Sequence, residues 1–255
     1  MNLRGVTIVL TLAFFQALQP TTSFAAFEAF GCRFDHFLHN ASMIDRTRSV
    51  SLMRVGRFGL PELAITGLRL SLPHGRMMYG AAYAATGDDI YREQKISGLC
   101  SVVLDDWIVQ VACDLYRIDI KDHGSATAPG VSLAAALRIN GWSGLEAGVD
   151  GLYRGSFRAN AEDLVRSAWG MVHAETGVNR ISLLLELPEG AEPSLGFGYS
   201  VRFLEKFGFR LMLMDNPNRI GGGIYFKISP VEATVSLDRH YPLGWTQSVG
   251  LKISW

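Results

Sequence analysis

The chain has 255 residues, of which 48% are hydrophobic and 19% charged, enough for one large domain or two small ones. Its 24 basic and 24 acidic residues give a formal net charge of zero. The chain therefore lacks the basic excess that nucleic-acid-binding domains carry, and nucleic acid is not an expected partner.

Residues 1–25 have the features of a signal peptide. Arg4 supplies a positive charge, Val6–Phe15 is an apolar run, and Ser23-Phe24-Ala25 has the small-x-small form of a cleavage site. A membrane anchor is the weaker alternative, because Gln16 interrupts the apolar run well before the roughly 18 residues that a spanning helix needs. We therefore predict export with removal of residues 1–25.

Residues 26–48 differ in pattern from the rest of the chain. Phe27, Phe30, Phe34 and Phe37 recur near helical spacing and precede a polar stretch. The pattern favours a short amphipathic segment that plugs a barrel, with a loosely ordered tail as an equal alternative.

Residues 49–255 are a succession of segments with a period of two. In Val231–Asp238, for example, every odd-numbered residue is apolar and every even-numbered residue is polar or charged, which is typical of a strand with two different faces. About fourteen such segments occur, each near the length of a membrane-barrel strand, and twelve is the alternative count. The expected strands are Val50–Arg57, Glu62–Leu72, Met77–Ala85, Lys95–Leu104, Trp107–Arg117, Gly130–Ile139, Leu145–Tyr153, Ser167–Glu175, Asn179–Leu187, Leu195–Leu204, Gly208–Met214, Gly223–Ser229, Val231–Asp238 and Thr246–Trp255.

Alternation alone also fits a soluble sandwich or a lipocalin-like barrel, so the connections decide between these folds. Every second connection is short, and those between are longer and more polar, which is the rim asymmetry of bacterial membrane barrels. The short connections are 73–76, 105–106, 140–144, 176–178, 205–207 and 229–230, and the long ones are 86–94, 118–129, 154–166, 188–194, 215–222 and 239–245. We therefore predict an all-β, antiparallel transmembrane β-barrel over residues 49–255.

The polar parity of such a barrel lines its lumen, and here it carries both signs of charge. The inward-facing charged residues are expected to be Arg69, Lys95, Asp114, Arg138, Glu146, Asp150, Glu175, Glu186, Arg202, Arg210, Lys227, Glu232, Asp238 and Lys252.

Two opposite-sign pairs are expected from the short turns. The turn at 229–230 sets Lys227 directly opposite Glu232, and the turn at 140–144 brings Arg138 nearly opposite Glu146. Pairs of this kind reduce the cost of burying a charge inside a barrel.

One like-charged pair is also expected. Arg202 and Arg210 face each other across the turn at 205–207, which requires water, an acid such as Glu186, or an anionic ligand between them. An anion-attracting spot in a pore is the functional interpretation, and a ladder completed by an acid is the structural one.

No catalytic or metal-binding motif stands out. The sequence contains no HExxH, no CxxC and no glycine-rich phosphate loop after a strand, so no metal or cofactor is expected. His173 shares the inward parity with Ser167 and Glu175, which makes a hydrolase-like cluster conceivable. Such a trio on one polar strand face is much better explained by chance, and we predict that the protein is not an enzyme.

The last strand, Thr246–Trp255, carries the sharpest signal. Val249, Leu251, Ile253 and Trp255 share one face, and the strand ends on an aromatic residue at the terminus. In this the chain resembles the bacterial outer-membrane β-barrel proteins, whose final strand typically ends in Phe or Trp. The resemblance implies that Leu251, Ile253 and Trp255 form a signal for the barrel assembly machinery, and that the partners are that machinery and outer-membrane lipid.

The number of strands and the possible plug are loosely similar to the fatty-acid channel family and the type IX secretion shuttle barrels. The first hypothesis is accordingly a passive pore or a transporter of hydrophobic or small solutes. The second is a structural barrel with a lumen closed by ion pairs, whose outer loops hold a protein partner. The third, a barrel hydrolase, requires His173 near an active serine.

Overall fold

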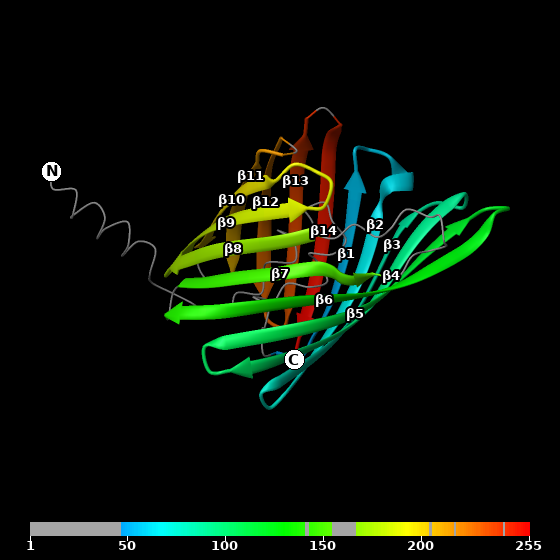
Figure 1. Ribbon diagram of the computed structural model, residues 1–255. Helices are drawn as coiled ribbons and strands as arrows, with labels where there is room; N and C mark the ends of the chain where they lie inside the picture. Colours follow the sequence, from blue (N-terminus) through cyan, green and yellow to red (C-terminus); the bar gives the residue numbers. More distant parts are fainter. Residues whose placement is uncertain (1–46, 141–142, 155–166, 204–205, 217, 242) are drawn as a thin grey trace.

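The computed structural model describes residues 47–140, 143–154, 167–203, 206–216, 218–241 and 243–255. The predicted signal peptide, and residues 26–46 of the predicted plug, lie outside these ranges. Fourteen strands form one closed barrel in which consecutive strands pair antiparallel, and β1 closes the ring against β14 (Figure 1). The predicted all-β fold and the count of fourteen are confirmed. The strands are β1 (Ser49–Arg57), β2 (Ile65–His74), β3 (Met77–Gly87), β4 (Tyr91–Leu104), β5 (Trp107–Ile120), β6 (Gly124–Asn140), β7 (Ser143–Arg154), β8 (Ser167–Thr176), β9 (Asn179–Pro188), β10 (Ser194–Phe203), β11 (Phe207–Met214), β12 (Arg219–Ile228), β13 (Val231–His240) and β14 (Gly244–Ser254).

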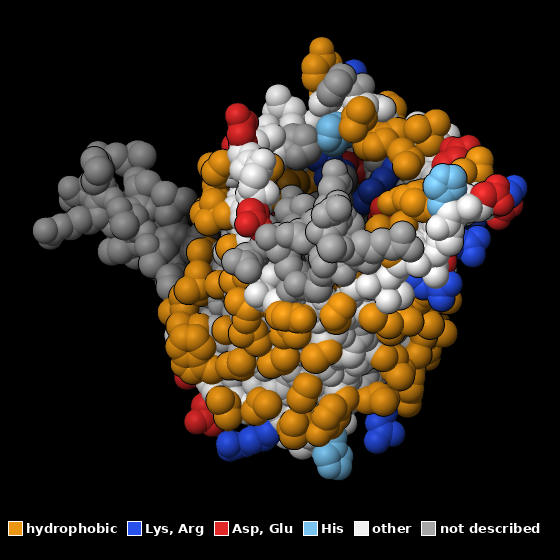
Figure 2. Space-filling model, turned by 45° about the vertical axis from the view of Figure 1, so that its right-hand side comes forward, with side chains coloured by type: hydrophobic (Ala, Val, Ile, Leu, Met, Phe, Trp, Pro, Cys, Tyr) orange, Lys and Arg blue, Asp and Glu red, His pale blue; other side chains and the backbone are white. Residues whose placement is uncertain are grey.

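The alternation of the sequence becomes a barrel with an apolar outside and a polar inside. In β13, Val235 is 51% exposed on the outer wall, whereas Asp238 on the inner wall is 1% exposed. A band of hydrophobic side chains crosses the visible face of the wall in the space-filling view, with charged side chains above and below it (Figure 2). Among the described residues, the one helix is a single 3-10 turn at Pro61–Leu63, and no helix is long and apolar enough to cross a membrane.

Closure depends on the predicted final strand. Leu251 pairs with Leu52 and Ile253 with Val50 across the seam between β14 and β1. The backbone N–H of Trp255 donates to the carbonyl of Arg48 at 3.0 Å, so the ladder continues to the last residue. No strand edge is left unpaired at this seam, as a bilayer requires.

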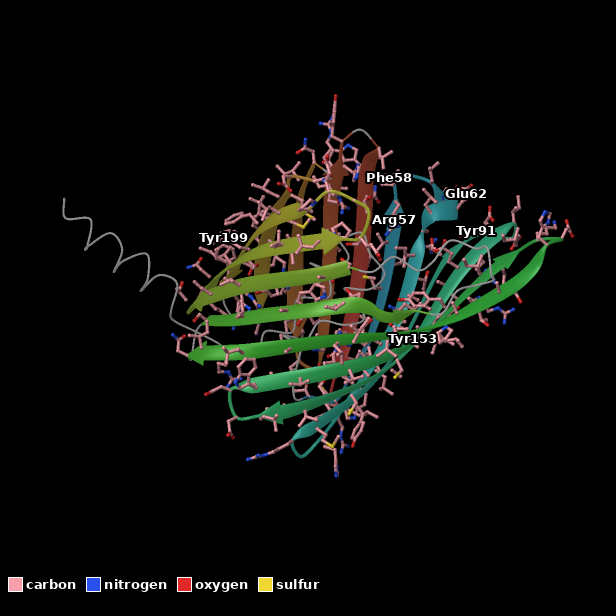
Figure 3. The ribbon with its side chains drawn as sticks, viewed as in Figure 1. Arg57, Phe58, Glu62, Tyr91, Tyr153 and Tyr199 are labelled. Atoms are coloured by element: carbon pink, nitrogen blue, oxygen red, sulfur yellow. The ribbon has the colours of Figure 1, made fainter. Side chains whose placement is uncertain are left out.

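The upper edge of the apolar band can be located on β1–β6 from two rows of directly paired, outward-facing residues. The lower row is apolar and the next row above it is largely polar. The apolar row is Leu52, Leu68, Tyr83, Ile96, Leu115 and Pro129; the polar row is Arg54, Thr66, Ala85, Gln94, Arg117 and Thr127. Tyr91 begins β4 and Tyr153 lies next to the last residue of β7. Both therefore lie at the same end of the barrel (Figure 3).

The strands β4, β5 and β6 continue past this polar row. The long loops expected at 86–94 and 118–129 are therefore wrong, because most of those residues extend the two hairpins and only 88–90 and 121–123 connect them. The physical reason is that a paired strand in water satisfies its backbone hydrogen bonds while carrying polar side chains, so polarity alone did not distinguish strand from loop. These hairpins project from one side of the barrel (Figure 1).

Inward-facing glycines provide room for large inward side chains on the neighbouring strand. Gly148 lies opposite Trp169, and a methyl group at Gly148 would come within 2.7 Å of the indole ring. Gly208 lies opposite Tyr225 in the same way. These glycines let the rings lie flat on the wall, close to the backbone.

Candidate functional site

The candidate site is the inner wall of the barrel, where the predicted charged residues lie. All nine share the parity of the buried, inward-facing residues of their strands, although Arg138 and Lys227, near the short-turn rim, are exposed. The nine are Arg69, Arg138, Glu146, Glu186, Arg202, Arg210, Lys227, Glu232 and Lys252, of which Arg69, Glu146, Glu186, Arg210 and Glu232 are buried.

The outer half of the lumen holds a compact polar cluster on β4, β5 and β6. Lys95 Nζ lies 3.3 Å from Asp114 Oδ2 and 4.7 Å from the centre of the Tyr116 ring. The hydroxyl of Ser97 donates to Asp114, and that of Ser132 does so at 3.4 Å. Lys95 and Asp114 are each almost fully buried, so both charges are compensated within the cluster.

A second buried ion pair, between Arg219 and Asp238, was not among the predicted pairs. Arg219 Nη2 donates to Asp238 Oδ2 at 2.6 Å, and both side chains are nearly inaccessible to water. His240 lies at the rim end of the same strand, with its ring edge-to-face against Phe58 at 5.6 Å between centroids. Arg219 fell in the expected loop 215–222, whereas in the structure it begins β12 and faces inward.

A longer chain of charged groups lies in the half of the lumen nearer the short-turn rim, on β7–β11. His173 Nδ1 lies 3.1 Å from Glu146 Oε1, and Arg202 Nη2 donates to Glu175 Oε1 at 3.2 Å. Arg180, which was not among the residues predicted to face the lumen, lies directly opposite Glu175 on the neighbouring strand. Its parity in Asn179–Leu187 was the signal that could have placed it inside.

The strand register determines which of the predicted opposite-sign pairs forms. Lys227 lies directly opposite Glu232, as the turn at 229–230 required. Arg138, however, lies opposite Gly144, while Glu146 lies opposite Ala136. The expectation for that pair is wrong because an irregularity in the β6–β7 ladder between Arg138 and Asn140 changes the register next to the turn, and Glu146 lies beside His173 instead.

The predicted arginine pair is also resolved by register. Arg202 lies opposite Gly208 and Arg210 opposite Ser200, so the two arginines are offset diagonally instead of face to face. Arg202 pairs with Glu175, which is an acid other than the expected Glu186. Arg210 is 4% exposed and stacks on Tyr225, with its guanidinium carbon 4.9 Å from the ring centre.

A hydrolase-like arrangement is not assembled among the described residues. Ser182 lies directly opposite His173, yet the imidazole leans the other way, over Gly144, where a methyl group would come within 2.8 Å of Nε2. Nδ1 lies beside Glu146, as it would in a catalytic triad, but Nε2 lies over the backbone of Gly144 and makes no hydrogen bond to a serine among the described residues.

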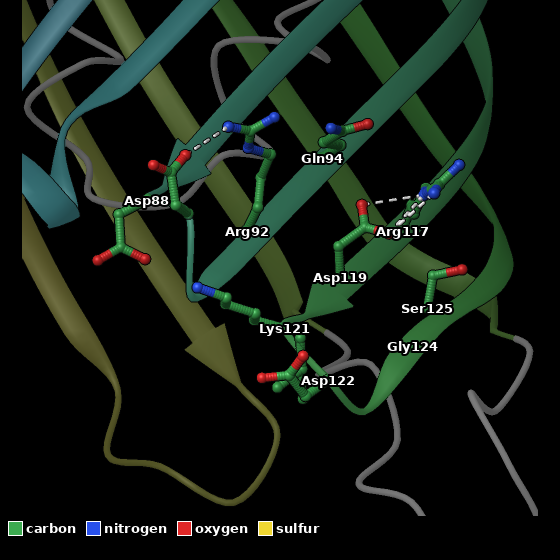
Figure 4. Close-up of a pocket in the computed structure, with 11 residues that line it drawn as sticks. Asp88, Arg92, Gln94, Arg117, Asp119, Lys121, Asp122, Gly124 and Ser125 are labelled. Atoms are coloured by element: carbon green, nitrogen blue, oxygen red, sulfur yellow. Dashed lines mark hydrogen bonds and ion pairs between the residues drawn. The ribbon is translucent and has the colours of Figure 1, made fainter.

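A second candidate site lies outside the lumen, on the projecting part of β4–β6. An open pocket of about 640 Å³ is lined there by charged residues of both signs, and two of its basic groups, Arg92 and Arg117, pair with neighbouring carboxylates (Figure 4). Arg117 donates to Asp119 through Nε at 3.0 Å and Nη2 at 2.8 Å. Backbone N–H groups of Tyr91 and Ile90 donate to Asp88 and lower its pKa, so this turn carries a fixed negative charge.

Comparison with known proteins adds a fold assignment. No protein-family model and no curated protein matches the sequence. The toluene transporter TodX of Pseudomonas putida superimposes with a TM-score of 0.62 at 7% identity, covering 95% of this chain and 96% of that one. The monoaromatic hydrocarbon channel CymD gives 0.62 at 9% identity with 94% of each chain covered, and a FadL homologue of Pseudomonas aeruginosa gives 0.57 at 11% identity with 96% of each covered.

This chain has the fold of the bacterial outer-membrane β-barrels. The resemblance drawn from the final strand is confirmed, and the outer membrane is the location that the fold supports. The apolar outer wall is then the lipid-facing surface of the outer-membrane barrel, and the polar row that begins at Arg54 marks the headgroup level on β1–β6.

Proposed function

We propose that this outer-membrane barrel is a passive channel for small hydrophilic solutes. The observation that carries the proposal is the series of charged and polar side chains on the inner wall, which runs from Lys95 and Asp114 in the outer half to Glu232 and Lys252 near the short-turn rim. Apolar groups such as Met53 and Leu99 occupy other parts of the same wall. Side chains that bear charge stabilise water and polar solutes and oppose apolar ones. TodX and CymD are described as carriers of aromatic hydrocarbons; the charged inner wall of this chain supports a different class of cargo.

The test is single-channel conductance of the refolded mature protein in planar bilayers. Stable ohmic steps are expected, with conductance that rises with the salt concentration. A barrel that is folded, as shown by altered migration before and after heating, but that passes no current would refute the channel.

A docking role is the second candidate, favoured by the projecting hairpins of β4–β6 and their charged pocket. Binding to a protein partner through this surface would be weakened by reversing the charge of Lys121, which lines the pocket. A pull-down in which Lys121→Glu and the unmodified barrel retain the same proteins would count against it.

A further inference from the structure

Arg210 is a buried cation with hydrogen-bonding capacity that the described residues do not use. Its side chain is 4% exposed, and neither Nη1 nor Nη2 has a hydrogen-bond partner among them. Its guanidinium lies over the face of the Tyr225 ring. Since stacking occupies a face of the guanidinium while its N–H groups point outward in the plane, the donors remain available to a ligand.

Arg210 belongs to a convergence of three arginines around one serine. Ser200 on β10 lies directly opposite Arg180 on β9 and directly opposite Arg210 on β11. Neighbouring strands are about 4.8 Å apart, so the two arginine backbones are separated by roughly 10 Å with the serine hydroxyl between them. Arg202 lies two residues further along β10 on the same inward face.

Three acids lie near this group, Glu146, Glu175 and Glu232, against its three arginines and the two lysines that flank Glu232. Glu146 attracts Arg180 electrostatically and lies 3.1 Å from His173 Nδ1. Glu175 lies opposite Arg180 and accepts from Arg202 at 3.2 Å, so it is shared between two guanidinium groups. Glu232 attracts Arg210 electrostatically but lies in register between Lys227 and Lys252. The local excess of positive charge falls on Arg210.

We infer that Arg180, Ser200, Arg202 and Arg210 form an anion-binding site in the lumen that takes the carboxylate or phosphate group of a small solute. A guanidinium presents two parallel N–H donors that match the two oxygens of such a group, and a serine hydroxyl supplies a further donor. A buried guanidinium without acceptors is unfavourable, and an oxyanion between Arg180 and Arg210 would satisfy it. Gly208 contributes by leaving room for Tyr225, since a methyl group there would come within 2.1 Å of the ring that supports Arg210.

The inference rests on the proposed function in one respect, because it assigns the class of solute that the channel prefers. The test therefore measures binding and conduction separately. Binding of inorganic phosphate and of acetate to the refolded full-length mature barrel would be measured by titration calorimetry, with bilayer reversal potentials in salt gradients measured alongside.

The unmodified barrel is expected to bind both probes and to pass anions in preference to potassium. Arg210→Gln should weaken phosphate binding at least tenfold and lower the anion-to-cation permeability ratio about threefold, because it removes one positive charge from the wall of the lumen. Arg210→Lys should keep the anion preference but lose the preference for phosphate over chloride, because an ammonium is a point charge without the planar fork.

The matched control is Arg54→Gln, which removes the same charge from the exposed outer wall. It should alter neither binding nor selectivity. If the unmodified barrel conducts with no anion preference and binds neither probe, the inference is overturned while the channel stands. If it binds phosphate through Arg210 but passes no current, the site stands and the channel fails. These measurements on the unmodified barrel decide the matter even if a variant does not fold.

Discussion

Gly148 is the position where a single methyl group tests the packing of the inner wall. It lies on β7 opposite Trp169 of β8, and its own backbone conformation is open to any residue, since its φ is not positive. An alanine there would therefore act through contacts alone. The added carbon would lie 2.7 Å from two atoms of the indole and 2.9 Å from the carbonyl oxygen of Leu133.

The size of the effect depends on which of these neighbours can move. The Leu133 carbonyl belongs to the barrel ladder and is fixed, and the indole is 6% exposed and packs against Ala134 and Ala136. Overpacking of this kind costs about 1–3 kcal/mol. Replacing a strand glycine by alanine otherwise gains roughly 0.5–1 kcal/mol, so Gly148→Ala should lower the free energy of unfolding by about 1–2 kcal/mol.

Gly98 is the matched control. It lies on the outer face of β4 with nothing within 4 Å of the position of an added carbon. Gly98→Ala should therefore raise the free energy of unfolding by about 0.5–1 kcal/mol. Equilibrium unfolding in urea, followed by tryptophan fluorescence of barrels refolded into lipid vesicles, measures both variants. Equal stability of the two would refute the idea that the glycine makes room for Trp169.

Three further predictions concern the outer wall, the buried ion pair and the terminus. Leu183→Arg, on the lipid-facing surface of β9, should cost about 2–4 kcal/mol of unfolding free energy, whereas Leu183→Phe should be tolerated; equal losses would contradict a lipid-facing wall. Arg219→Met should cost about 3–5 kcal/mol because it leaves the carboxylate of Asp238 buried alone, and adding Asp238→Leu should recover most of that loss; no recovery would argue against a paired charge. Trp255→Ala should reduce the amount of folded barrel in the outer membrane of cells more than Trp107→Ala, another exposed rim tryptophan, although both should refold in vitro; equal yields in cells would count against a terminal assembly signal.

The parts of the fold that the sequence predicted are those governed by a strict period of two. Val231–Asp238 and Thr246–Trp255 were placed correctly because half of their side chains meet lipid, and lipid tolerates few polar groups. The extension of β5 to Ile120 was missed for the opposite reason. Beyond Leu115 the alternation inverts, with Arg117 and Asp119 on the outward parity and Ile118 and Ile120 on the inward one, although the hydrogen-bonded ladder continues.

The site was predicted at the level of faces and not of contacts. Parity placed Arg202 and Arg210 in the lumen, but their partners depend on register: the two arginines are offset by two residues, and Arg202 meets Glu175 because Glu186 pairs with the opposite end of β10. The expected contact between Arg138 and Glu146 does not form because the register changes at an irregularity in the ladder, which no local sequence motif indicates. Arg180 was overlooked since it lies one residue inside a strand, where a turn residue is equally plausible from sequence.

The separation of the two faces explains why fold likeness says little about cargo in this class of protein. Outward residues such as Leu183 need only be apolar, and the backbone ladder is indifferent to side chains, so barrels at about 10% identity keep one architecture. Inward residues need not be apolar, and the backbone ladder does not restrict their side chains. They are therefore free to differ between barrels. The cargo of the proposed channel would therefore be determined by the inner wall of this chain, where Arg210 lies buried beside Tyr225 with donors that an anion would satisfy.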